Sequence, residues 1–425
     1  MNDERIERAL GVGPPDEPAY RARGSAHWRA TTRTSSPARP IGIRAATWTG
    51  RLATVTFGMV ALLVAVQLLA GRNQPAALPF GDYPMYKGGP GRTGEASGAG
   101  PTGPVDTIWS VSIPGSTESS PAIAGAVAYV VGGDHRTHAL SMVDGEESWV
   151  SEGAAYVGSP AYADGRVFVL GRDFSVSALD AASGELRWRS GDSIYPLSSP
   201  LVLDGLVVAG TPDGLVAFDA TTGTPRWTLP TGGGIERSAT GADGLVVAGS
   251  DDGVIHVVDA ATGVERWSRE IATGAFPTPV IRNGVLYATA PTAAGDTLFA
   301  LDVSTGVERW TFRSPSGLPF RTPSVDGDTA YVGTVDGPTY AVSITAGSLR
   351  WTNDAILSVA AIAIAGGDLI ACTDDLRVIA IDRLTGTTEW SVAIGGLVDA
   401  GTAVANGRVV VATSTGDILA LGTDP

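Results

Sequence analysis

The 425-residue chain contains a single cysteine, Cys372, and a single lysine, Lys87. One cysteine excludes an internal disulfide and any metal site built from several thiolates. Cys372 lies in a strand-like run, DLIACTDD, which favours a small buried apolar residue over a reactive thiol. A catalytic thiol would need a paired histidine, and the four histidines form no recognisable motif with it; they stand at positions 27, 135, 138 and 256.

Charged residues are also scarce, at 17% of the chain, and the basic ones are unevenly placed. Residues 1–51 carry nine arginines and five acidic residues, whereas residues 73–425 carry 19 basic and 39 acidic residues. The large C-terminal part therefore accounts for more than the whole net charge of −15. An acidic body without a basic stripe repels polyanions, so nucleic acid is not an expected partner.

One long uncharged run is present, LATVTFGMVALLVAVQLLA, from Leu52 to Ala70. A helix of this length rises by about 28 Å, close to the hydrocarbon thickness of a bilayer. Arginines precede it closely at 33, 39, 44 and 51, and Arg72 alone follows closely. The positive-inside rule then predicts a transmembrane helix with a cytoplasmic N-terminus and an extracytoplasmic C-terminal body.

A cleaved signal peptide is the alternative interpretation of this run. It would need a leading segment of about 50 residues, which is far too long, and no clean A-x-A site follows. The sequence LLAG resembles a lipoprotein box, but Arg72 stands where the lipidated cysteine belongs. We therefore expect a retained signal-anchor helix over 52–70, preceded by a disordered cytoplasmic tail over 1–51 that is rich in Pro, Ser, Thr and Arg.

Residues 71–104 are rich in Gly and Pro and are predicted to be a linker and a lead-in to the next domain. Beyond them the tryptophans are periodic. The eight that follow the membrane helix are separated by 40, 39, 39, 40, 43, 41 and 39 residues: Trp109, Trp149, Trp188, Trp227, Trp267, Trp310, Trp351 and Trp390. A period near 40 is typical of a repeat architecture.

Each of the last seven tryptophans closes a copy of one phrase, such as ALDAASGELRW or ALDVSTGVERW. The phrase predicts a hairpin whose Asp caps the turn amides and whose Gly supplies a positive φ. Asp occupies this position in five copies, at 180, 219, 259, 302 and 382, and Ser141 and Ser343 replace it in two. Each Trp is expected to dock between neighbouring repeats.

Turn signals upstream divide every unit into four short strands, which indicates a propeller blade. The chain ends at Pro425 before a further Trp, and VDTIWSVSI (105–113) is a lone Trp-containing strand. Joining the two ends completes one blade and removes the exposed sheet edges. The sequence thus predicts an all-β, eight-bladed β-propeller of four-stranded blades over 105–425, closed by its N- and C-terminal strands and preceded by one transmembrane helix.

The pattern A-x-D-x-x-[ST]-G-x-x-x-W resembles the tryptophan-docking motif of the pyrroloquinoline-quinone (PQQ)-like repeat family. The resemblance covers about residues 83–425, and DYPMYKGGPGRTG (82–94) is similar to the family's opening segment. The family includes quinone-dependent alcohol and glucose dehydrogenases as well as noncatalytic members, such as the outer-membrane assembly lipoprotein and receptor ectodomains. The motif therefore specifies the fold much better than the function.

Several departures from the dehydrogenases point away from catalysis. Family dehydrogenases are generally longer, bind calcium near the quinone and carry an adjacent-Cys disulfide, whereas this chain has one cysteine. The pairs Asp251–Asp252 and Asp374–Asp375 are explained by hairpin-turn chemistry rather than by calcium binding. We expect no catalytic residues, no metal site and neither PQQ nor Ca²⁺ as a cofactor.

The inner strand of each blade opens onto the channel of a propeller, where ligands and partner peptides bind. Residues just before these strands are predicted to form a mixed aromatic and charged rim: Glu118, Tyr156, Tyr195, Glu236, Arg237, Phe276, Phe320, Arg321 and Asp399. Aromatic residues and Arg commonly anchor interfaces. The alternative is that these residues only cap the strand ends.

The sequence favours a membrane-anchored, noncatalytic binding or scaffold module for a protein, peptide or ligand of the cell envelope. A PQQ-dependent oxidoreductase of reduced size is one alternative, and a sensor ectodomain is another.

Overall fold

The computed structural model describes residues 81–152, 155–191, 193–196, 198–354 and 361–423. The predicted cytoplasmic tail (1–51), the predicted membrane helix (52–70) and most of the linker lie outside these ranges. Within them, no helix has both the length and the apolar character needed to cross a bilayer.

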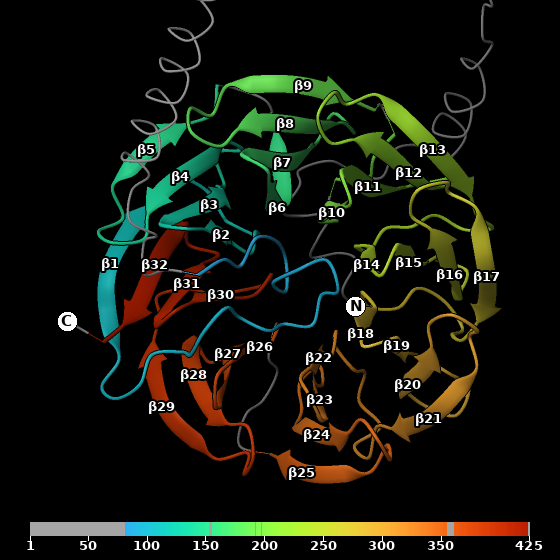
Figure 1. Cartoon of the computed structure of the whole chain (residues 1–425). Coiled ribbons are helices and arrows are strands. Elements are labelled where there is room, and N and C mark those ends of the chain that lie inside the picture. The colour runs from blue at the N-terminus through green and yellow to red at the C-terminus, as the bar shows by residue number, and fades with distance from the viewer. Residues whose placement is uncertain (1–80, 153–154, 192, 197, 355–360, 424–425) are drawn as a thin grey trace, which may run out of the picture. The chain divides into compact units, whose positions relative to one another are not determined.

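Eight four-stranded sheets stand around a common centre, as Figure 1 shows. The prediction of an all-β, eight-bladed propeller is thereby confirmed. Each sheet is an antiparallel meander in which strand order in space follows strand order in the sequence. The closing blade is the exception, because its outermost strand comes from the opposite end of the propeller chain.

The blades are numbered along the chain, and their strands are given from the centre outward. Blades 1 to 4 consist of β2 (Ala122–Ala124), β3 (Val127–Val131), β4 (Thr137–Ser141) and β5 (Glu147–Val150); β6 (Tyr156–Ala163), β7 (Arg166–Gly171), β8 (Val176–Asp180) and β9 (Leu186–Ser190); β10 (Leu201–Leu203), β11 (Leu206–Thr211), β12 (Gly214–Asp219) and β13 (Pro225–Pro230); β14 (Thr240–Ala242), β15 (Leu245–Gly249), β16 (Val254–Asp259) and β17 (Glu265–Glu270).

Blades 5 to 8 consist of β18 (Val280–Arg282), β19 (Val285–Ala290), β20 (Thr297–Asp302) and β21 (Glu308–Arg313); β22 (Ser324–Val325), β23 (Thr329–Gly333), β24 (Thr339–Ser343) and β25 (Leu349–Asn353); β26 (Ala363–Ala365), β27 (Asp368–Thr373), β28 (Arg377–Asp382) and β29 (Thr388–Ala393); β30 (Ala403–Ala405), β31 (Arg408–Ala412), β32 (Asp417–Gly422) and β1 (Asp106–Ser112).

Blade 8 closes the ring by pairing the first strand with the last. β1 runs antiparallel to β32, with Trp109 opposite Ala420 and Val111 opposite Ile418. The backbone N–H of Ile113 extends the ladder by donating to Gly416 O at 2.8 Å. The closure of the ring by the N- and C-terminal strands of the propeller, which the sequence predicts, is thereby confirmed.

Burial follows the position of a strand within its blade. The second strand, such as β11, is buried along almost its whole length, because neighbouring blades cover both of its faces. The outer strand, such as β13, alternates between exposed and covered residues around Trp227. The continuous apolar runs of the sequence therefore form the second strands, and the alternating runs that contain Trp form the outer strands.

The repeated phrase forms the turn between the third and fourth strands. In blade 3, Asp219 Oδ1 accepts hydrogen bonds from the N–H groups of Thr221 at 3.0 Å and Thr222 at 2.8 Å. Arg226 binds the other carboxylate oxygen at 2.7 Å. The Thr222 hydrogen bond and the Arg226 pair hold the pKa of Asp219 down at about 2.

Each tryptophan of the repeats reaches the turn of the next blade. Trp188 Nε1 donates to Ala220 O at 3.1 Å, and the indole lies against Gly223, where an added Cβ would approach the ring to 2.6 Å. Gly223 has a φ of 71°, so the turn geometry and the close approach both require glycine. The other seven indoles make the same type of bond, and Trp390 alone donates to the lead-in, at Pro101 O.

Candidate functional site

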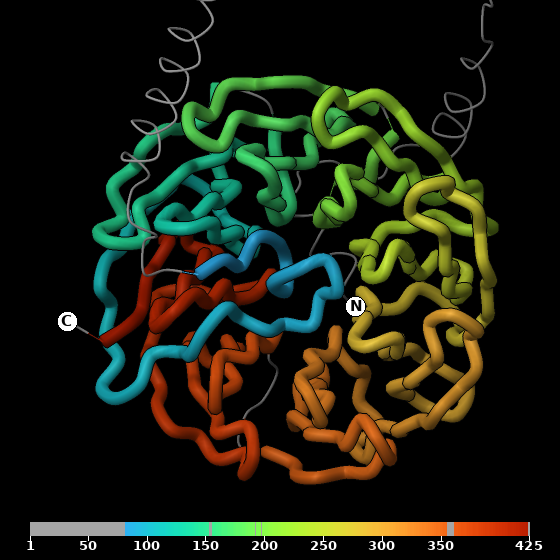
Figure 2. The backbone as a smooth tube through the Cα atoms, viewed as in Figure 1, coloured from blue at the N-terminus to red at the C-terminus, as the bar shows by residue number. Residues whose placement is uncertain are grey.

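Residues 82–100, which the sequence places in a linker and lead-in, fill the centre of the ring (Figure 2). We call them the channel segment. Their main chain bonds directly to seven of the eight blades, and the Arg92 side chain reaches the remaining one. The contacts are Tyr83 with Ile123, Pro84 O with Tyr162 N, Arg92 with Ser199 O and Pro200 O, Pro90 O with Gly241 N, Gly91 O with Ile281 N, Thr93 O with Val325 N, Gly94 O and Ala96 N with Ile364, and Ala99 O with Gly407 N.

Two buried cations hold the channel segment in place. Lys87 Nζ donates to Thr322 O at 3.3 Å, Pro323 O at 2.6 Å and Ser324 Oγ at 2.7 Å. Burial lowers its pKa to about 7. All three donors of the ammonium group are used within the protein, so Lys87 is not directed toward a ligand.

The Arg92 side chain, which has no exposed surface, is satisfied in the same way. It donates to Ala239 O, Tyr86 O, Ser199 O and Pro200 O at 2.8–3.2 Å. Burial lowers the pKa of its guanidinium to about 10. The guanidinium therefore ties the channel segment to blades 3 and 4.

The channel segment lies toward one end of the channel. Asp82 Oδ1 accepts from Gly125 N at 2.8 Å, and Ala99 O accepts from Gly407 N at 2.8 Å, both in turns that join a first strand to a second strand. Each loop between successive blades leads into the first residue of an inner strand. That residue lies at the opposite end of the strand from the turn to the second strand. We call that end the mouth; the predicted rim residues lie around it.

Three of the predicted rim aromatics are core residues. Tyr156, Phe276 and Phe320 are 2–3% exposed. Phe320 packs edge-on against Tyr340, with ring centroids 6.2 Å apart, and its N–H donates to Asp296 Oδ2 at 2.7 Å. These rings fix the interblade loops and offer no surface to a partner.

The charged members of the predicted rim remain accessible. Glu118, Glu236, Arg237 and Asp399 are exposed, and Tyr195 and Arg321 are half-buried. The mouth is thus mainly a charged surface, and Tyr195 is the one predicted rim aromatic that keeps exposed area.

One acidic pair lies where blades 8 and 1 meet. Partial burial raises the pKa of Glu118, the negative charge of Asp399 adds to the rise, and Arg172 opposes it. Arg172 follows β7, and its Nε is buried with no hydrogen-bond partner among the described residues. This side of the mouth carries two carboxylates and one arginine.

A second group combines residues of the mouth with the channel segment. Tyr86 extends from the channel segment, and its ring lies 5.6 Å from the Arg92 guanidinium carbon. Burial raises the pKa of its hydroxyl, while a hydrogen bond with Thr322 opposes the rise. The positive charges of Arg237 and Arg321 also oppose the rise of this pKa.

Asp251, on the turn after β15, completes this group. Partial burial raises its pKa to about 6; Glu236 and Asp252 add to the rise, and Arg237 opposes it. Sequence reasoning missed Tyr86 and Arg172, and it assigned Asp251 to a hairpin turn alone. The unusual specificity of DYPMYKGGPGRTG inside a Gly- and Pro-rich stretch is the one signal that could have indicated Tyr86.

Blade 4 holds a Ser–His–Glu arrangement that the sequence did not reveal. Ser250 Oγ lies 3.1 Å from His256 Nε2, and His256 Nδ1 lies 2.6 Å from Glu265 Oε1. The connectivity is that of a hydrolase triad. Ser250, however, is 1% exposed and its hydroxyl bonds to Asp252 and Val254 O, so substrate has no access to it.

His138 in blade 1 occupies the equivalent strand and is held in the same way. Its Nδ1 lies 2.7 Å from Glu147 Oε2, and its Nε2 lies 3.1 Å from Asp134 Oδ1. The repetition identifies both histidines as braces between a turn and the outer strand of their own blade.

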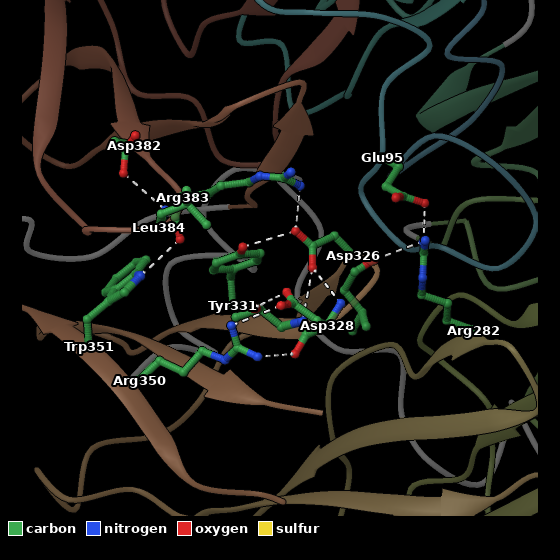
Figure 3. A network of polar contacts seen from close by, with 12 residues as sticks. Glu95, Arg282, Asp326, Asp328, Tyr331, Arg350, Trp351, Asp382, Arg383 and Leu384 are labelled. Carbon is green, nitrogen blue, oxygen red and sulfur yellow. Dashed lines mark hydrogen bonds and ion pairs between the residues drawn. The ribbon is translucent and has the colours of Figure 1, made fainter. Parts of the chain in front are cut away.

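Acidic residues elsewhere are also structural. Asp326 Oδ1 accepts from Asp328 N and Thr329 N, and its Oδ2 accepts from the Tyr331 hydroxyl at 3.0 Å and from Arg383 at 2.8 Å (Figure 3). The last bond joins blade 6 to blade 7. In the described part of the chain, no three His, Cys, Asp or Glu side chains are grouped to hold a metal ion.

Cys372 is buried, and burial raises the pKa of its thiol. A thiol in that environment stays protonated, which agrees with the expectation of a packing residue.

Comparisons with known proteins extend these observations. A family model described as outer membrane protein assembly factor BamB matches residues 102–233 and 212–358. No curated protein sequence matches the chain.

Solved structures share the architecture. BamB from Moraxella catarrhalis is 19% identical with a TM-score of 0.65, over 76% of this chain and 98% of that chain. Quinohemoprotein alcohol dehydrogenase from Comamonas testosteroni is 15% identical with a TM-score of 0.67, over 83% and 82%. The computationally designed protein Ika8 is 16% identical with a TM-score of 0.66, over 75% and 99%. At these identities, the likeness shows the fold alone.

Proposed function

The chain belongs to the PQQ-like repeat family of β-propellers, and from this premise we propose that it is a noncatalytic binding module of the cell envelope. Its binding surface is the mouth, and its partner is a protein or peptide. The observation that carries the proposal is the channel segment, which occupies the centre of the ring with the chain's own residues and bonds to every blade. The surface left for a partner is the charged mouth.

The alternative function, quinone-dependent oxidation, fits these residues poorly. PQQ is a flat tricarboxylate, and a site for it needs cations for its carboxylates and planar surfaces for its rings. Lys87 and Arg92 are bonded to main-chain carbonyls, and the rings of Tyr156, Phe276 and Phe320 are buried. We therefore propose that the protein works without the quinone.

A titration separates the two functions. The purified full chain is mixed with PQQ and Ca²⁺, and quinone absorbance and alcohol- or sugar-dependent dye reduction are followed. A binding module shows neither stoichiometric uptake nor turnover. Stoichiometric uptake accompanied by turnover would establish an oxidoreductase instead.

Location is part of the proposal. The uncharged run Leu52–Ala70 and its flanking arginines support a single-pass anchor with the propeller outside the cytoplasm. Protease treatment of intact cells and of lysed cells tests this topology. The propeller should be cleaved from outside in intact cells; protection until lysis would contradict the proposed orientation.

Partner capture tests the mouth itself. The full chain, solubilised from membranes, should retain a specific envelope protein, and Arg237→Glu should weaken that retention. Arg313→Glu makes the same charge change at an exposed arginine of β21 and serves as the control. Phe320→Ala would report on stability rather than binding, because Phe320 is buried.

A further inference from the structure

We propose that a pocket between blades 5 and 6, at the end of the propeller opposite the mouth, binds a small organic acid through its single carboxylate group. The rest of the ligand is an apolar body that lies against Trp310. The site is separate from the mouth, so this inference goes beyond the proposed binding function and is tested independently of it.

The pocket has a volume of about 300 Å³ and lies where the turn between β18 and β19 meets blade 6. Trp310 and Ile344 give it an apolar wall, and Arg282, Tyr287, Arg309 and Thr345 give it a polar one. The rings of Tyr287 and Trp310 lie with their centroids 6.0 Å apart. A pocket of this size suits a ligand with one ring or one branched chain.

The boundary between blades 6 and 7 shows what normally fills this place. Tyr331 is the third residue of β23, as Tyr287 is of β19. The Tyr331 hydroxyl donates to Asp326 Oδ2 at 3.0 Å, and Arg383 binds the same oxygen at 2.8 Å (Figure 3). The tyrosine of blade 6 is therefore satisfied by a carboxylate of its own blade.

Blade 5 has a cation where blade 6 has that carboxylate. Arg282 follows Ile281, which pairs with Leu286, just as Asp326 follows Val325 in the equivalent pairing. Ile344 likewise stands where the next blade has Arg383, because Trp310 donates to Ile344 O and Trp351 donates to Arg383 O. The carboxylate is thus missing from the boundary of blades 5 and 6, and a pocket remains.

Tyr287 is left without an acceptor. Only 1% of the residue is exposed, yet its hydroxyl forms no hydrogen bond with the residues that the structure describes, whereas the equivalent Tyr129 donates to Ala181 O at 3.1 Å. Burial raises the pKa of Tyr287 to about 12, and the positive charges of Arg309 and Arg282 oppose the rise. The hydroxyl therefore stays protonated at neutral pH and can donate to a ligand.

Both arginines of the pocket keep unused donors. Arg282 Nη1 binds Glu95 and the carbonyl of Val325, but its Nε is buried without a partner among the described residues. Arg309 binds Asp302 through Nη2 at 2.8 Å and makes no other side-chain hydrogen bond within the described ranges. Two guanidinium groups and a phenol form a donor set suited to a carboxylate.

The charges around the pocket restrict the ligand to one carboxylate. Glu95 and Asp302 each neutralise one arginine from outside the lining, and the propeller as a whole is strongly acidic. A second carboxylate on the ligand would be repelled. The apolar wall of Trp310 and Ile344 favours an aryl or branched alkyl group as the body of the acid.

Fluorine NMR of para-fluorophenylacetate tests the proposal. Its resonance should broaden when the full chain, solubilised in detergent, is added, and should not broaden with the detergent alone. The amide, para-fluorophenylacetamide, carries the same ring without the charge. It should bind at least about tenfold more weakly, because hydrogen bonds to a charged group are the stronger ones.

Variants with matched controls locate the site. Tyr287→Phe and Arg309→Gln should each weaken binding about tenfold. Tyr129→Phe removes a hydroxyl that already bonds within the fold, and Arg266→Gln changes the equivalent arginine of blade 4, so neither should alter binding.

Arg282→Asp gives blade 5 the carboxylate that blade 6 has, and should abolish binding by satisfying Tyr287 from within the chain. Melting temperatures establish that every variant is folded. Equal broadening of the acid and the amide would overturn the inference, as would binding that survives both Tyr287→Phe and Arg309→Gln. An absence of broadening at millimolar concentrations of the acid would also overturn it, and none of these results affects the mouth.

Discussion

Arg92 shows how a single side chain can hold several segments of a fold together. Its guanidinium is completely buried, and hydrogen bonds to four carbonyl groups replace the water that it loses. Burying a charge is tolerated only when its donors are satisfied, so the four carbonyls and the cation depend on one another. Removing the guanidinium would leave four buried carbonyl groups without this donor, and displacing the carbonyls would leave a buried charge unsatisfied; either change would destabilise the fold.

Arg92→Met is therefore expected to destabilise the protein by about 3 kcal/mol or more, because several buried carbonyls lose their donor. Urea unfolding followed by tryptophan fluorescence measures the change. The control is Arg166→Met, which removes a half-exposed arginine bonded to Asp164 O at 3.3 Å and should cost less than about 0.5 kcal/mol. Equal effects of the two substitutions would contradict a structural role for Arg92.

Asp251 gives a prediction about pH. Its pKa in the folded protein is raised to about 6 from the ordinary 3.8, so the folded state favours the protonated carboxyl. The associated stabilisation is complete below pH 3.8 and is lost as the pH rises through 6. At pH 8 the carboxylate faces Glu236 and Asp252, with only Arg237 in opposition.

Asp251→Asn should accordingly raise stability at pH 8 by no more than about 1 kcal/mol, since partial exposure screens the neighbouring charges. The gain should shrink between pH 6 and pH 4. Unfolding curves at pH 4, 5, 6 and 8 measure it, and a gain independent of pH would rule out this explanation.

At the scale of elements, the repeated turn is the feature that the sequence predicted well. Its Asp, Gly and Trp act within one hairpin and its neighbour, so their spacing in the chain reports their spacing in space. Blade 6 departs from the pattern: Ser343 stands in place of Asp, and Arg350 pairs with Asp328 at 3.0 Å instead. That turn, like the turn of blade 1 with Ser141, lacks the carboxylate that caps the turns of blades 2 to 5 and 7.

Ser343→Asp is predicted to stabilise blade 6 by about 0.5–1 kcal/mol, the size of the effect of a capping carboxylate at a helix start. Thermal unfolding measures the change. Ser343→Asn, which caps without adding charge, separates the hydrogen bonds from the attraction to Arg350. A loss of stability in both variants would show that Ser343 is already the better residue.

The sequence predicted the mouth only in part. Glu236 and Arg237 lie at the accessible surface, but Tyr156, Phe276 and Phe320 are buried, because a position in a loop does not reveal the direction of a side chain. The channel segment was beyond reach for another reason. Its partners are main-chain atoms of all eight blades, and main-chain atoms leave no pattern in a sequence.

At the scale of the whole molecule, the channel segment joins blades that are otherwise linked only to their neighbours. A propeller without it would rely on interblade packing and on the β1–β32 pairing to stay closed. The segment adds a direct bond from one piece of chain to each blade, so it should contribute to the cooperativity of unfolding as well as to stability.

A chain that begins at residue 105 should therefore melt more than about 5 °C below a chain that begins at residue 81, and over a broader range. Differential scanning calorimetry compares the two. A synthetic peptide of residues 81–104 should restore part of the difference when added to the shorter chain. Identical melting curves would show that the segment is dispensable.

The pairing of β1 with β32 also determines when the ring can close during synthesis. Ser112 and Asp417, which bond across that pair, lie 305 positions apart, so the first strand to be synthesised waits for the last. Loop closure over such a distance is slow compared with hairpin formation. Blades 1 to 7 can fold as they leave the ribosome, but blade 8 can form only after β32 has emerged. The nascent propeller therefore remains an open ring, with β1 unpaired, until β32 is available.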